Sequence, residues 1–137
     1  MTDTRNAPAQ TRTMTIRQYR LAVTGAAVAA AEAAYLVIHY GAGVDLALHS
    51  GTTVGAASVA VAALVAALAG WALLAVLERF TKRARTVWTV VAAVVYGLSL
   101  LGPVDAVSTS AVVGLDILHA VVAVVLIGAL PRPCFRR

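Results

Sequence analysis

The chain has 137 residues, of which 61% are hydrophobic and 12% are charged, and its formal net charge is +5. A soluble domain typically carries about 25% charged residues, so this composition excludes a water-soluble globular core and indicates one domain that lies largely in lipid. The positive charge does not indicate a nucleic-acid partner, because the basic residues form three clusters outside the apolar runs. The single cysteine, Cys134, excludes an intrachain disulfide.

The chain begins with a polar segment, residues 1–16, which we expect to be a disordered cytoplasmic tail. The first apolar run covers about 19–38 and is long enough to span a bilayer, which needs roughly 20 helical residues. Basic residues before an apolar stretch are also typical of a signal peptide. Here Glu32 interrupts the region where cleavage would fall, so the sequence favours a retained span.

Three further apolar runs follow, and we expect spans at about 53–77, 86–102 and 110–130. Glycine and proline end the third run, and proline ends the fourth. The sequence therefore predicts a transmembrane domain over 17–131 and a basic cytoplasmic tail over 132–137.

The placement of the cations predicts how the chain crosses the membrane. Of its 11 Lys and Arg residues, four lie at or before position 20, where the first run begins, three follow the last, and four lie between the second and third runs, namely Arg79, Lys82, Arg83 and Arg85. The other two loops carry none. Short loops rich in Lys and Arg stay in the cytoplasm. We therefore expect an all-α bundle of four transmembrane helices in the plasma membrane, with both termini cytoplasmic.

The segment from Gly70 to Thr89 is typical of a tight cytoplasmic turn between two spans. Trp71 and Trp88 flank the cations and are predicted to be interfacial anchors. The cations could also bind anionic lipid headgroups. Glu78 stands four residues before Lys82, a spacing that favours an ion pair if the second helix extends that far.

Small residues at four-residue spacing predict where helices approach closely in lipid. In the first run, Gly25, Ala29 and Ala33 have this spacing, and we expect them to form a packing face within one monomer. Whether copies of the chain also associate into a homo-oligomer stays open.

Two acids fall inside predicted spans, where an ionisable group is costly and often functional. They are Glu32 in the first run and Asp116 in the fourth, and His119 follows Asp116 at a spacing that puts both on one helix face. If the first and last helices pack together, the three residues could meet. They could then serve as structural hydrogen-bonding groups or exchange a proton or cation in a small transporter, because a desolvated carboxyl group takes up a proton more readily.

A third hypothesis joins these groups to the polar residues of the outer loops as a metal site; those residues are His39, Asp45, His49 and Asp105. The sequence contains no recognised ligand spacing, no phosphate-binding glycine loop and no nucleophile arrangement. We therefore expect no enzyme activity, no cofactor and no bound metal. The leading expectation is an integral membrane protein with a structural or accessory role, and a proton-coupled transporter or exporter is the alternative.

Three segments resemble a family of small actinobacterial membrane proteins of unknown function: LAGWALLAVLERFTKRARTVWTVVA, LSLLGPV and LHAVVAVVLIGALPR. The resemblance covers most of the chain after the polar tail and implies four spans with a basic turn. The positions that match the family pattern are Trp71, Glu78, Arg79, Trp88, Thr89, Pro103 and His119. It implies no reaction, ligand or partner. Small four-helix multidrug exporters also place a glutamate in the first span, but that similarity is one of architecture alone.

Overall fold

The computed structural model describes residues 14–131, apart from the side chains of Val104 and Asp105. This part of the chain forms α1 (Ile16–Leu36), α2 (Ala56–Phe80), α3 (Ala84–Ser99) and α4 (Thr109–Ala129). The predicted all-α fold is therefore confirmed for these residues, whose only extended pairings are two isolated bridges. The predicted tails, 1–16 and 132–137, lie almost entirely outside the described residues.

Side chains cap the N-termini of the first and last helices, α1 and α4. Thr15 begins α1 with a reciprocal capping box, in which its hydroxyl accepts from the Gln18 backbone N–H and the Gln18 side chain accepts from the Thr15 N–H. Ser108 begins α4, where its hydroxyl accepts from the Ala111 N–H at 3.2 Å. Both caps satisfy amides that a helix start otherwise leaves unpaired.

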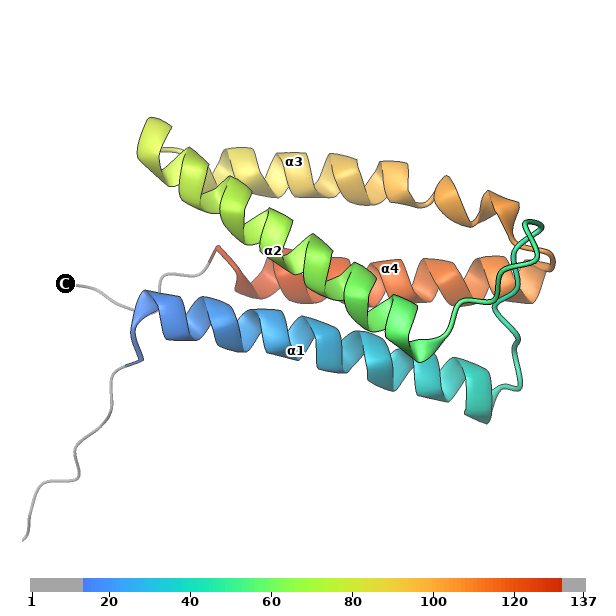
Figure 1. The fold of residues 1–137 in the computed structure, drawn as a ribbon. Helices are drawn as coiled ribbons and strands as arrows, with labels where there is room; N and C mark the ends of the chain where they lie inside the picture. The colour runs from blue at the N-terminus through green and yellow to red at the C-terminus, as the bar shows by residue number, and fades with distance from the viewer. Residues whose placement is uncertain (1–13, 132–137) are drawn as a thin grey trace, which may run out of the picture.

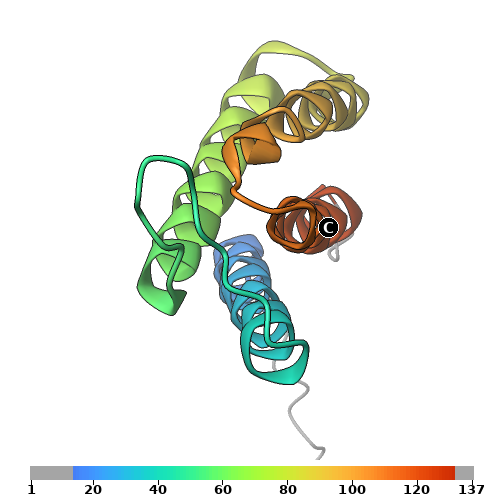
Figure 2. The ribbon, with the colours of Figure 1, turned by 90° about the vertical axis from the view of Figure 1, so that its right-hand side faces the viewer.

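The helices run alternately up and down, and α2 crosses the bundle obliquely (Figure 1). Helix α1 packs mainly against α2 and α4, whereas α3 packs against α2 and α4 on the other side. Figure 2 shows the bundle end-on, with the connection from α1 to α2 lying across this end. A three-residue turn separates α2 from α3, so the predicted tight turn is confirmed in its geometry.

Two clusters of buried side chains hold the helices together. One cluster lies near the loops between α1 and α2 and between α3 and α4, and it includes Tyr35, Leu46 and Leu115. The second lies toward the α2–α3 turn and includes Leu74 and Trp88. The first cluster includes Leu46 and Ala106, one from each of these loops. The loops are also joined directly, because Leu48 and Ala106 form a bridge and the Val107 N–H donates to the Ala47 carbonyl at 3.0 Å.

The packed face of α1 differs from the prediction. The expected face points outward: no atom lies within 4 Å of a Cβ built on Gly25, and Ala29 and Ala33 are exposed. The buried residues are instead Val23, Thr24, Ala27, Ala31 and Tyr35. An alanine-rich helix presents small residues at four-residue spacing on several faces. The packing falls on the face that also buries larger side chains, because contact area grows with side-chain size.

Three segments are long and apolar enough to cross a membrane: Ile16–Gly41, which is α1 with its final π-helical turn, Ala56–Phe80 and Thr109–Ala129. Helix α3 is apolar but has 16 residues, about 24 Å at 1.5 Å per residue. It falls short of the roughly 20 residues that cross a hydrocarbon core unaided.

Candidate functional site

Glu32 on α1 and Asp116 on α4 each have one carboxyl oxygen that is buried and lacks a hydrogen bond. Glu32 Oε1 and Asp116 Oδ1 are buried and have no hydrogen-bond partner among the described residues. A buried polar atom without a partner costs free energy of roughly 1–3 kcal/mol, and more if it is charged. Each carboxyl group therefore needs a proton, a cation or a polar molecule to complete its environment.

Two contacts define the register between the antiparallel helices α1 and α4. A Cβ built on Gly114 would lie 3.1 Å from Ile38 Cγ2, and the Tyr19 hydroxyl donates to the Ala129 carbonyl at 2.9 Å. In that register Glu32 lies about level with Leu118, and Asp116 lies about two residues nearer the loop end, a difference of roughly 3 Å. The two acids therefore lie at similar depth along the bundle.

Equal depth does not bring the three predicted residues into contact. No hydrogen bond or ion pair joins Glu32, Asp116 and His119 in the described part of the chain. Glu32 follows the core residue Ala31, and Asp116 follows Leu115, so each carboxyl group lies about 100° around its helix from a buried neighbour. Both acids thus lie at the edge of the packed faces, and both are partly exposed.

His119 bonds to the helix backbone. Its Nδ1 lies 2.7 Å from the carbonyl oxygen of Leu115. Since a carbonyl oxygen only accepts, Nδ1 carries the hydrogen, and Nε2 of the neutral ring is left as an acceptor. Sequence spacing placed His119 and Asp116 on one face, but the backbone carbonyl one turn earlier takes the hydrogen bond.

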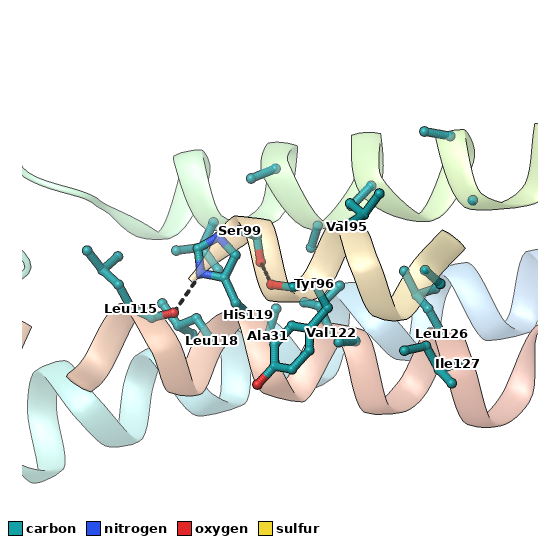
Figure 3. A pocket seen from close by; sticks show the side chains of 18 of the residues that line it. Ala31, Val95, Tyr96, Ser99, Leu115, Leu118, His119, Val122, Leu126 and Ile127 are labelled. Carbon is teal, nitrogen blue, oxygen red and sulfur yellow. Dashed lines mark hydrogen bonds between the residues drawn. The ribbon is translucent and has the colours of Figure 1, made fainter. Parts of the chain in front are cut away.

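The His119 ring lines a cavity of about 410 Å³ between α2, α3 and α4. Its lining is apolar except for Tyr96, Ser99 and His119. Figure 3 shows Ser99 beside the His119 ring and the Tyr96 hydroxyl pointing away from it. Glu32 and Asp116 do not line it. The sequence pointed to His119 but not to this cavity, which depends on how far apart α2, α3 and α4 lie.

Of the polar residues considered for a metal site, His39 belongs to a small aromatic group at the end of α1. The last turn, Val37–Gly41, is π-helical. His39 stacks on Tyr35 with ring centroids 5.5 Å apart and meets Tyr40 edge-on at 4.7 Å. His39 Nδ1 also lies 3.6 Å from Asp45 Oδ1. No group of three or more His, Cys, Asp or Glu residues suited to a metal occurs among the described residues, and the side chain of Asp105 lies outside them.

At the other end of the bundle, Glu78 forms an ion pair with Arg20 of α1. The expected pair between Glu78 and Lys82 is wrong, because α2 ends at Phe80 and Lys82 stands in the turn, where helical spacing no longer applies. The predicted topology and headgroup residues all have exposed side chains at this end: Arg79, Lys82, Arg83 and Arg85. They are available to solvent or to headgroups.

The two predicted anchors differ in burial. Trp88 is 2% exposed and lies against Gly70 of α2, whereas Trp71 is partly buried beside the same cluster. The pairing of Trp88 with Gly70 was missed from the sequence. A glycine facing an aromatic residue across a short turn is the pattern that would have pointed to it.

Three long apolar helices, two of them carrying an acid inside the apolar segment, indicate a membrane protein. The chain belongs to the family of unknown function DUF6069, whose model matches residues 11–134. The resemblance to a family of unknown function is confirmed to that extent, and the match does not bear on organism range or on the number of spans. No curated protein and no solved structure matches the chain significantly.

Proposed function

We propose that this chain is a non-catalytic integral protein of the plasma membrane with a structural or accessory role. The observation that supports it is the exposed apolar surface. In the most apolar windows of the three long helices, only 22–33% of residues are buried within the chain. Branched side chains such as Val61, Val94 and Val124 point outward. Surface of this kind is stable against lipid tails and costly in water.

The alternating helix directions support four crossings. Helices α2 and α4 are each long enough to span the bilayer, and they run in the same direction in Figure 1. Helix α3 must therefore carry the chain back across the bilayer between them. Its 16 residues are continued by Leu100 and Leu101, and local thinning of the bilayer accommodates a short span at modest cost.

Cations support an orientation with the α2–α3 turn in the cytoplasm. Arg17 and Arg20 of α1 lie at the same end of the bundle as this turn, and the loops at the other end contain no Lys or Arg. The positive-inside rule then places both termini in the cytoplasm. The cations at this end can bind anionic lipid headgroups, and each cation near the surface contributes roughly 1 kcal/mol of binding free energy.

Reporter fusions test this topology. A fluorescent reporter that matures only in the cytoplasm should be active at the C-terminus and after Lys82. Alkaline phosphatase, which is active only outside, should be active after Gly43 and inactive after Lys82. Phosphatase activity at the C-terminus would overturn the proposed orientation, and extraction of the chain by alkaline carbonate would overturn membrane integration.

A second candidate is proton-coupled transport through Glu32 and Asp116, with His119 assisting. It is favoured by the two buried carboxyl oxygens that lack partners. Vesicles that contain the wild-type chain should then carry a proton flux, and Glu32→Gln and Asp116→Asn should each reduce it at least tenfold, as expected for loss of an essential proton carrier (on the order of 1.4 kcal/mol). Glu78→Gln, at the end of α2 beside the turn to α3, is the matched control. A wild-type flux equal to that of empty vesicles contradicts transport and leaves the structural role.

A further inference from the structure

We propose that the cavity between α2, α3 and α4 binds an uncharged, long-chain hydrophobic alcohol through His119. The cavity volume of about 410 Å³ falls within the range of small-molecule sites, roughly 300–1,000 Å³. The space exists because seven alanines and Gly70 stand where longer side chains would fill it. This inference does not depend on whether Glu32 and Asp116 carry protons across the membrane.

The polar groups of the cavity lie at one level. Trp88 and Leu130 both contact Gly70, at 3.5 and 3.6 Å from its built Cβ. Eleven residues separate Trp88 from Ser99 on α3, and eleven separate Leu130 from His119 on the antiparallel α4. Ser99 and His119 are therefore level with each other, as Figure 3 shows, and roughly 16 Å from Trp88.

The neutral His119 ring has unused hydrogen-bonding capacity that complements a hydroxyl. With Nδ1 donating to the Leu115 carbonyl, Nε2 of the neutral ring is an acceptor. The Tyr96 hydroxyl points away from the His119 ring in Figure 3 and has no hydrogen-bond partner among the described residues. The Ser99 hydroxyl already donates to the Tyr96 carbonyl at 2.7 Å. A ligand O–H can therefore donate to Nε2.

The depth of the site requires a ligand without charge. His119 is the central residue of α4, so its ring lies near the middle of a membrane-spanning helix. A charged headgroup at that depth needs a countercharge, and the cavity lining contains no Asp, Glu, Lys or Arg. Phospholipid headgroups are thereby excluded. From His119 toward Trp88 the lining is apolar, as a hydrocarbon chain requires.

Quenching of Trp88 fluorescence tests the proposal. In a Trp71→Phe background reconstituted in vesicles, Trp88 is the remaining tryptophan and it lines the cavity. The probe is octadecanol brominated in the distal half of its chain, because bromine quenches indole on contact. Its methyl ether lacks the O–H donor, and phosphatidylcholine with brominated chains reports any acyl chain. We expect saturable quenching by the alcohol, and weaker quenching by the ether and by the phospholipid at equal mole fraction.

Variants locate the site. His119→Leu should weaken the apparent affinity for the alcohol by about three- to tenfold, the effect of one hydrogen bond, and Tyr96→Phe should leave it unchanged. Ala123→Phe should abolish quenching by filling the cavity, and Val124→Phe, on the exposed surface beside it, should not. Equal quenching by alcohol and ether on the unaltered cavity would overturn the proposal. So would undiminished quenching in Ala123→Phe.

Discussion

The indole N–H of Trp88 donates a hydrogen bond to the backbone carbonyl oxygen of Gly70, 2.8 Å away, and so joins α3 to α2. The ring packs directly on Gly70: a Cβ there would lie 3.5 Å from Trp88 Cζ2, at ordinary van der Waals contact. This contact stands next to the α2–α3 turn and forms one end of the cavity. It fixes how closely α2 and α3 approach at this end.

Trp88→Ala should therefore lower the free energy of unfolding by about 3–5 kcal/mol, because it removes a large buried side chain and leaves a cavity. Trp88→Phe should cost about 1–3 kcal/mol, since most of the ring area is kept and the hydrogen bond is lost. The measurement is denaturant-induced unfolding in detergent micelles. Trp71→Phe, at a less buried position, is the control, and an equal loss there would contradict a special role for Trp88.

Gly114 is the closest approach of α4 to the first loop. A Cβ there would lie 2.8 Å from Leu46 Cδ2 and 3.1 Å from Ile38 Cγ2. Both atoms are ends of side chains, so Gly114→Ala should cost about 1 kcal/mol and Gly114→Val about 3 kcal/mol. Gly128 on the same helix has open space around it, and Gly128→Ala should stabilise by about 0.5–1 kcal/mol. Similar effects at both glycines would show that α4 does not pack as described.

The Arg20–Glu78 ion pair joins α1 to the end of α2, with Arg20 at 11% and Glu78 at 44% side-chain exposure. Because Glu78 is largely solvated, we expect Glu78→Gln to cost no more than about 1 kcal/mol, and less in molar salt. Arg20→Gln should cost more than Arg17→Gln, since Arg17 is exposed. A double-mutant cycle with both partners measures the coupling, and a coupling energy of zero at low salt would contradict a stabilising pair.

Ser108 provides the cap of α4. Ser108→Ala should lower the free energy of unfolding by about 1 kcal/mol, because the Ala111 amide loses its acceptor. Thr109 is exposed in the first turn of the same helix and is the matched control. Hydrogen exchange of the first-turn amides measures the effect directly. Faster exchange in Thr109→Ala than in Ser108→Ala would be inconsistent with the assigned cap.

Much of the fold could be predicted because the hydropathy pattern is strong. The second run was expected at 53–77 and α2 spans Ala56–Phe80; the fourth was expected at 110–130 and α4 spans Thr109–Ala129. The packed face of α1 could not be predicted, since Gly25 and Ala27 belong to competing small-residue faces of one helix. The partner of Glu78 was missed because Arg20 is 58 residues away in sequence.

The sequence by itself determined that the chain forms long apolar helices, and it named the polar residues within them, because hydrophobicity and charge are properties of single residues. Only the tertiary structure decided their surroundings. It placed His119 in an apolar cavity with Tyr96 and Ser99, and it left Glu32 and Asp116 outside that cavity. The physical reason is that a side chain's neighbours depend on helix rotation and spacing. In an alanine-rich chain these are set by a few distant contacts, such as Trp88 with Gly70.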